Sequence, residues 1–201
     1  MTGVSFDYDE ATTIVLPGAE RPTDVSAWAA SAVERWAKIH DLPAETASTL
    51  QRALERAQRS AATDASMNLL LLDPGTGAVA PLRLTLLGRP LTEEEQRRYL
   101  WPASVTRPQL RRHVAPALGP GWSSTVLEDA ERATVRWVHA PVGATVFSAL
   151  GPLPAPAVLA SAVRVEEILE SLRLDGVAPG DGTALVAHVA GEPVADGPWA
   201  V

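Results

Sequence analysis

Three short segments in the second half of the chain, each rich in β-branched residues, most constrain how it can fold. They are WSSTVLE from Trp122, ATVRWVHA from Ala133 and ATVFSAL from Ala144, joined by short polar or Gly/Pro turns. This pattern is typical of an antiparallel meander. A Pro-rich link and an amphipathic helix over residues 158–174 follow. The sequence therefore predicts a sheet that is closed by a helix.

The first half of the chain adds short strands and two helices. The first 16 residues are rich in β-branched residues, and Thr23 or Asp24 can cap the helix that follows. This helix carries Trp28 and Trp36 on its apolar face. With a second, Ala-rich helix it predicts an αα-hairpin over about residues 23–62.

The middle of the chain combines a strand pair with two capping boxes. MNLLLL and PLRLTLL are separated by the turn sequence DPGTG, which predicts two strands around a turn. The capping box at Thr92–Glu95 predicts a short helix to about Leu100. A similar box at Thr106–Gln109 predicts another short helix, which Pro116 and Gly119 end.

These elements together predict an α+β fold. We expect a mostly antiparallel sheet of five to seven strands, covered by the Trp-bearing N-terminal helix of the αα-hairpin and by the long C-terminal helix, because every apolar stripe then finds a sheet to cover. Residues 1–175 form a single domain in this interpretation. Residues 176–201, rich in Gly and Pro, are expected to form a poorly ordered tail, although ALVAHV could add a strand.

Composition and charge exclude several classes of protein. The chain has 201 residues and no cysteine, which excludes disulfides, thiolate metal sites and cysteine nucleophiles. A net charge of −7 argues against binding nucleic acid or anionic membranes. The N-terminus has no signal-peptide pattern, so we expect a cytoplasmic protein. Sixteen Arg beside one Lys, with abundant Ala and Pro, indicate a GC-rich bacterial genome.

Short catalytic and cofactor motifs are missing from the sequence. The four His, at positions 40, 113, 139 and 188, have no spacing typical of a metal site. No nucleophile elbow or phosphate-binding loop is present. We therefore expect no metal, no cofactor and no enzymatic activity.

Two groups of residues are candidates for binding. Trp101, the basic cluster of Arg107, Arg111 and Arg112, and Trp199 in the tail could form a surface for a protein partner. Ordinary solvent-exposed positions are the alternative for the arginines.

The second group, Arg136, Trp137 and His139, could line a pocket beside the sheet. His139 has a structural alternative as well. It would then close its strand at the edge of the sheet, with its ring packed and its polar edge in water.

The segment from Trp122 to Leu174 resembles the Mog1/PsbP-like α+β family. The resemblance rests on the strand RWVHAP and on Ile168-Leu169-Glu170-Ser171-Leu172 at the end of the last helix. Members of that family are mostly binding or assembly proteins without a shared catalytic residue. The resemblance implies a fold and no site residue.

Two functions remain open from the sequence. The first is a non-enzymatic cytoplasmic accessory protein that binds a protein partner or self-associates. The alternative is a small-molecule-binding protein, or an enzyme without a short motif, whose pocket lies between sheet and helices.

Overall fold

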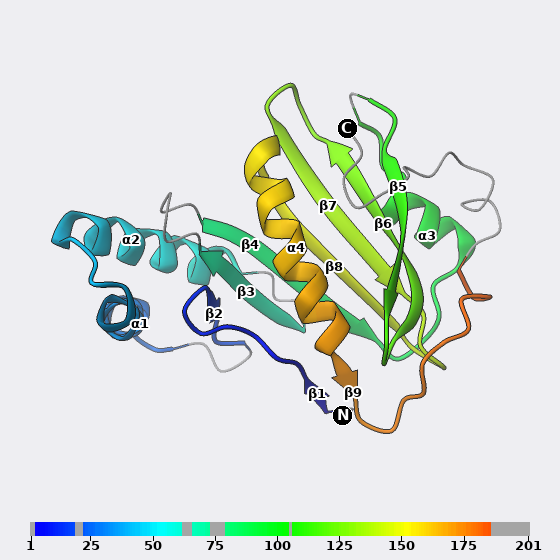
Figure 1. The fold of residues 1–201 in the computed structure, drawn as a ribbon, viewed down its shortest axis with the longest axis horizontal. Coiled ribbons are helices and arrows are strands. Elements are labelled where there is room, and N and C mark those ends of the chain that lie inside the picture. The colour runs from blue at the N-terminus through cyan, green and yellow to red at the C-terminus, as the bar shows by residue number, and fades with distance from the viewer. Residues whose placement is uncertain (1–2, 19–21, 62–65, 73–78, 105, 186–201) are drawn as a thin grey trace.

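A computed structural model of the chain describes residues 3–18, 22–61, 66–72, 79–104 and 106–185. These residues form an α+β fold, as the sequence predicts (Figure 1). Their helices and strands follow in the order β1 (Val4–Ser5), β2 (Thr13–Val15), α1 (Val25–His40), α2 (Ala44–Ser60), β3 (Met67–Leu72), β4 (Val79–Leu87), α3 (Glu93–Leu100), β5 (Gln109–Ala115), β6 (Gly119–Leu127), β7 (Arg132–His139), β8 (Thr145–Pro154), α4 (Ala155–Ser171) and β9 (Arg173–Leu174).

Seven of the described strands form one antiparallel sheet. Its order is β2-β3-β4-β8-β7-β6-β5, while β1 and β9 pair separately. The meander predicted from Trp122 onward is confirmed as β6, β7 and β8, and the predicted pair in the middle of the chain is confirmed as β3 and β4. Thr92 and Glu95 form the predicted capping box at the start of α3.

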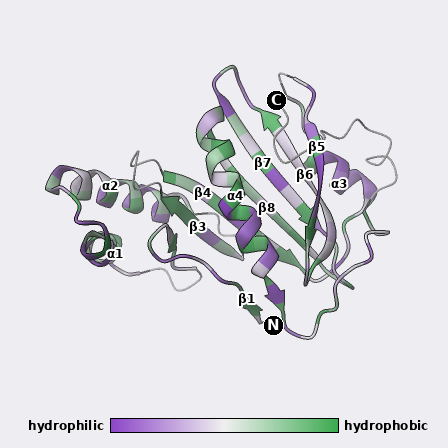
Figure 2. Ribbon diagram, in the orientation of Figure 1, coloured by the Kyte–Doolittle hydropathy of each residue, from purple (hydrophilic) through white to green (hydrophobic). Residues whose placement is uncertain are grey.

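Helix α4 covers one face of the sheet, which we call the α4 face. Its buried residues Val158, Val165 and Ile168 pack with Leu82 of β4 and Trp137 of β7 in the main core. Figure 1 shows α4 crossing in front of β7 and β8, and Figure 2 shows both hydrophilic and hydrophobic segments along it. Because successive side chains of a strand point to opposite faces, alternate residues of these strands face away from α4.

The opposite face is covered at its two ends by different elements. The αα-hairpin of α1 and α2 packs through Trp36 and Leu54 against Leu70 and Leu72 of β3. Asp24 caps α1 by accepting a hydrogen bond from the backbone of Ala27. At the other end, α3 packs over β6 and β7. The sheet between these two ends carries half-exposed side chains on this face.

The segment after β9 continues around the end of the sheet, although the sequence assigns it to a tail. The backbone of Gly180 donates to the carbonyl of Leu118, and Leu185 is buried beside Trp122. Gln96 of α3 donates to the carbonyl of Ala184 at 2.8 Å. Residues 176–185 therefore lie against the domain, whereas 186–201 lie outside the described residues.

The prediction of a helix from the second capping box, at Thr106–Gln109, is wrong. The segment forms β5, whose register with β6 pairs Gln109 with Thr125 and Ala115 with Gly119. Leu110 is buried among Leu100 and Trp122, and its alternation with Arg111 gives the strand two faces. Tertiary pairing with β6 outweighs the local capping signal here.

None of the helices in the described ranges combines the length and the apolar content needed to cross a bilayer.

Candidate functional site

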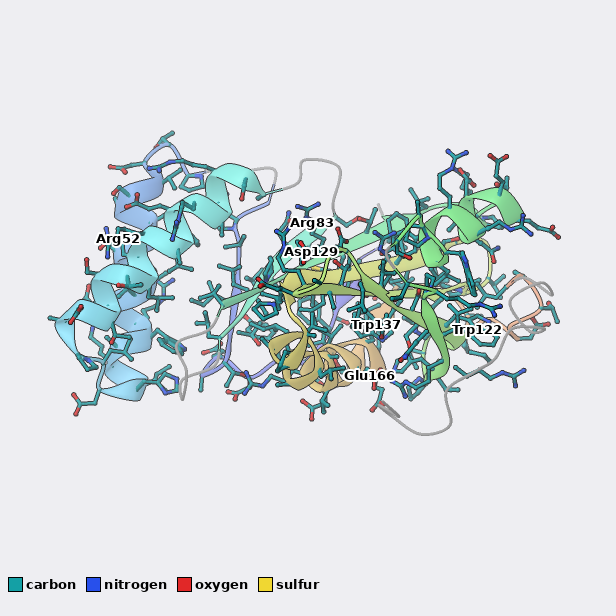
Figure 3. The ribbon with its side chains drawn as sticks, turned by 90° about the horizontal axis from the view of Figure 1, so that it is seen from above. Arg52, Arg83, Trp122, Asp129, Trp137 and Glu166 are labelled. Atoms are coloured by element: carbon teal, nitrogen blue, oxygen red, sulfur yellow. The ribbon has the colours of Figure 1, made fainter. Side chains whose placement is uncertain are left out.

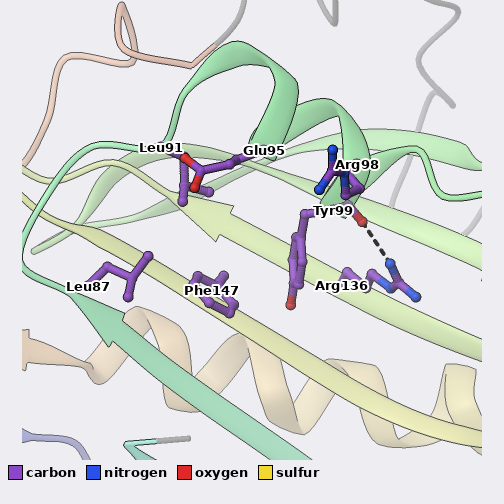
Figure 4. Close-up of a pocket in the computed structure, with 7 residues that line it drawn as sticks. All are labelled: Leu87, Leu91, Glu95, Arg98, Tyr99, Arg136 and Phe147. Carbon is purple, nitrogen blue, oxygen red and sulfur yellow. Dashed lines mark hydrogen bonds between the residues drawn. The ribbon is translucent and has the colours of Figure 1, made fainter. Parts of the chain in front are cut away.

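A cleft lies between α3 and the sheet, on the face opposite α4 (Figure 4). We call it the α3 cleft, and its volume is about 280 Å³. Strands β4, β7 and β8 provide its floor, while α3 and the residues before it provide its wall. Its lining residues are Leu87, Leu91, Glu95, Arg98, Tyr99, Arg136 and Phe147.

The charged groups at the rim of the α3 cleft form ion pairs. Glu95 accepts two hydrogen bonds from the Arg89 guanidinium, at 2.7 and 2.8 Å, and one from the backbone of Thr92. These bonds, led by those from Arg89, lower the pKa of Glu95 to about 2. Arg98 pairs with Glu94 on the solvent side of α3. Glu95 is therefore an ionised structural group and not a proton donor at neutral pH.

Tyr99 ties α3 to the floor of the cleft. Its hydroxyl donates to the carbonyl of Ser148 at 2.6 Å, and its ring lies 5.0 Å from that of Phe147. Burial raises the pKa of Tyr99 above its ordinary value, so the phenol stays neutral. Arg136 donates to the carbonyl of Tyr99 at 3.0 Å and lies 5.5 Å from the ring centroid.

The described lining of the α3 cleft offers apolar contacts and hydrogen bonds. Leu87, Leu91 and Phe147 give it an apolar lining. Its carboxylate is ionised, its phenol is neutral, and arginine side chains act only as donors. General acid–base catalysis needs a group that exchanges a proton near the working pH, and neither Glu95 nor Tyr99 is such a group.

The three residues of the predicted pocket are divided between the two faces of the sheet. Arg136 lines the α3 cleft, whereas Trp137 and His139 lie on the α4 face and are fully buried. The indole N–H of Trp137 donates to Glu166 of α4 at 3.3 Å. Figure 3 shows Trp137 and Glu166 together on the α4 side of the sheet.

The interpretation of His139 as an edge residue with its polar side in water is wrong. Strand β7 lies inside the sheet between β6 and β8, and His139 has no exposed surface. His113 of β5 and His139 occupy one row across the sheet, with Gly121 of β6 between them. A Cβ at Gly121 would lie 2.5 Å from the His139 ring, so only glycine lets the two rings meet.

The direction of the hydrogen bonds in this pair follows from its surroundings. His139 Nδ1 lies 3.0 Å from the carbonyl of Gly119, which can only accept, so His139 Nδ1 carries the hydrogen. His139 Nε2 then accepts from His113 Nδ1 at 2.9 Å. His113 Nε2 is left as a buried acceptor without a partner among the described residues.

Both imidazoles are held neutral. Burial lowers the pKa of His139 to about 4. Burial, followed by the nearby charges of His139 and Arg111, lowers the pKa of His113 to about 3. The pair lies away from the α3 cleft, and His113 borders a second cleft, described below.

The predicted partner surface is also divided by the sheet. Arg111 faces α4 and forms an ion pair with Glu166, while Arg112 lies over the Trp122 ring on the other face, 5.5 Å from its centroid. Arg107 lies over the ring of the half-buried Trp101, at 5.1 Å. Trp199 lies outside the described residues, so no surface joins all five side chains in the described structure.

A second cleft of about 440 Å³ lies beside Trp122. Arg112, Pro120, Asp181 and Leu185 are among its lining residues. The Asp181 carboxylate accepts from the hydroxyl and the backbone of Thr183. Leu185 is the last described residue, so the chain continues from the border of this cleft.

Sequence reasoning found Arg136 and missed the rest of the α3 cleft. Leu87 and Phe147 belong to predicted strands, and the capping box placed Glu95 at the start of a helix. The missing signal was the position of α3 over β6 and β7, with Tyr99 against Phe147 of β8, which depends on long-range packing. In the described ranges, no group of three or more His, Asp or Glu has the arrangement of a metal site.

The resemblance of residues 122–174 to the Mog1/PsbP-like family stays a prediction. No family model matches the chain, and no curated protein or solved structure is significantly similar to it.

Proposed function

We propose that this chain is a non-enzymatic, cytoplasmic binding protein that holds an apolar side chain of a protein partner in the α3 cleft. The observation that carries the proposal is the cleft itself: an apolar lining of Leu87, Leu91 and Phe147 behind a rim of paired charges. Protein interfaces combine buried apolar anchors with a polar rim in this way.

The size of the α3 cleft favours a side chain over a free small molecule. Small-molecule pockets span about 300–1,000 Å³ and enclose most of the ligand. A volume of about 280 Å³ lies just below that range. One aromatic or aliphatic side chain of a larger partner would occupy it, with the rest of the interface formed on the surrounding sheet and helix.

The proposal agrees with other properties of the chain. The net charge of −7 disfavours nucleic acid as the partner. The absence of cysteine is compatible with a reducing cytoplasm. The predicted resemblance to the Mog1/PsbP-like family, whose members are mostly binding or assembly proteins, points in the same direction.

A selection from a phage-displayed library of random heptapeptides tests this function. We expect the wild-type chain to enrich peptides that share an apolar residue, and Leu87→Trp to enrich none of them, because the larger indole fills the cleft. Val163→Trp is the matched control, since Val163 is 48% exposed on α4, on the other face. Equal enrichment on wild type and on Leu87→Trp, or none on wild type, would contradict the proposal.

A small-molecule ligand is the second candidate, and the cleft beside Trp122 favours it. Its volume of about 440 Å³ lies inside the range of ligand pockets. A thermal-shift screen with metabolites would support this candidate only if stabilisation is lost in Trp122→Leu.

A further inference from the structure

Two arginines flank an alanine in one row across the middle of the sheet. Arg83 of β4 pairs with Ala149 of β8, and Ala149 pairs with Arg136 of β7. Directly opposite residues of neighbouring strands point to the same face. Adjacent strands lie about 4.8 Å apart, so the two arginine backbones are roughly 10 Å apart with only a methyl group between them.

This row lies on the same face as the α3 cleft. Leu82 and Leu84 point into the core under α4, so Arg83 points away from it. In Figure 3, Arg83 lies on the side of the sheet opposite Glu166 of α4. Both arginines therefore lie beside the cleft, and no large side chain of this row fills the space over Ala149.

The two arginines differ in how they are held. Arg83 is exposed, and no described residue forms an ion pair or a hydrogen bond with its side chain. Arg136 donates to the carbonyl of Tyr99 and forms an ion pair with Glu128 at 3.8 Å, and Glu128 also accepts from Thr134. A guanidinium has five N–H donors, so both side chains retain donors for an anion.

The distance from this row to the α3 cleft is short and fixed by the strand. Phe147, in the floor of the cleft, precedes Ala149 by two residues on β8. Two residues of extended chain span about 6.8 Å. An extended segment lying along β8 would therefore place side chains at the cleft and over Ala149 when they are two positions apart.

Resting on the proposed function, we propose that the partner segment is acidic: its apolar side chain fills the α3 cleft, and an Asp or Glu two positions away binds Arg83 and Arg136 over Ala149. Arginine forms strong, directed hydrogen bonds with carboxylates. The chain as a whole is negative. An acidic segment is therefore attracted locally, at this row, and repelled elsewhere.

The heptapeptide selection tests this inference separately from the proposed function. We expect the enriched peptides to carry Asp or Glu two positions from the apolar residue. On Arg83→Gln, the apolar preference should persist and the acidic one should weaken, because Arg136 remains. Apolar enrichment without acidic residues would overturn this inference alone, whereas no cleft-dependent enrichment would overturn the proposed function as well.

A synthetic enriched peptide then measures the contact. Replacing its acidic residue by the amide should weaken binding to the wild type about five- to tenfold at low salt, which is the range for two partly exposed ion pairs. The same replacement should change binding to Arg83→Gln only about two- to threefold, because the pair with Arg136 remains. Arg35→Gln, which removes an exposed charge on α1, is the matched control and should behave as wild type. An equal loss on Arg83→Gln and wild type would contradict the contact.

Discussion

We expect the protein to lose stability steeply in mild acid, and replacing His113 and His139 should abolish most of this loss. His113 and His139 form a chain of hydrogen bonds that ends at the buried Nε2 of His113. A proton added there would create an N–H group with no hydrogen-bond acceptor among the described residues. Their pKa values are lowered to about 3 and about 4. In the unfolded chain a histidine titrates near its ordinary pKa of about 6.5.

The sign of the pH dependence follows from these values. Below about pH 6.5 the unfolded state binds two protons that the folded state excludes, so stability falls as the pH falls. Each proton contributes about 1.4 kcal/mol per pH unit, and two protons over roughly 1.5 units give a loss of about 4 kcal/mol between pH 7 and pH 5. This is a large part of the ~5–15 kcal/mol that stabilises a typical domain.

Urea denaturation, followed by tryptophan fluorescence at half-unit steps from pH 7 to pH 5, measures this slope. The double variant His113→Gln/His139→Asn should lose less than about 1 kcal/mol over that range, whatever its stability at pH 7. Leu54→Ala, which opens a cavity in the hairpin core, controls for lost stability and should keep the wild-type slope. A flat wild-type profile, or a double variant that keeps the slope, would show that the two histidines do not set the pH dependence.

Two further substitutions test how the sheet and α4 are held together. Glu166→Ala removes the acceptor shared by Arg111 and the indole of Trp137. In chemical denaturation it should lower the free energy of unfolding by about 2–3 kcal/mol. The control Glu167→Ala, at an exposed position, should lower it by less than about 0.5 kcal/mol. Gly121→Ala places a Cβ against the His139 ring and should lower the free energy of unfolding by about 1–3 kcal/mol. Gly88→Ala, whose Cβ would have no atom within 4 Å, should be close to neutral in the same assay. Equal effects of the two substitutions within either pair would contradict the packing described above.

Local patterns predicted most of the elements of this fold. The alternation of Val135, Trp137 and their neighbours predicted β7, and the capping box at Thr92 predicted the start of α3. These signals act within a few residues, so they are visible in the sequence. The box at Thr106–Gln109 shows their limit, because pairing with β6 converts its segment into β5.

The relations between distant residues could not be predicted. His113 and His139 meet across Gly121, and Arg83 and Arg136 face each other across Ala149. Both arrangements depend on the register of three strands, and a shift of one residue would turn each side chain to the other face.

The α3 cleft could not be foreseen for a similar reason. Its wall depends on how α3 docks, through Tyr99, on the carbonyl of Ser148. The sequence indicated neither this contact nor the burial of Leu185 beside Trp122.

Mapping a bound peptide on the protein is the most direct test of whether the α3 cleft binds a partner. A peptide enriched in the selection would be titrated into the methyl-labelled chain and followed by NMR. We expect shifts and intermolecular contacts at the methyl groups of Leu87 and Leu91, with Phe147 in the same patch, and no change at Leu54 in the hairpin core. Contacts confined to any other surface, with Leu87 and Leu91 unchanged, would contradict it.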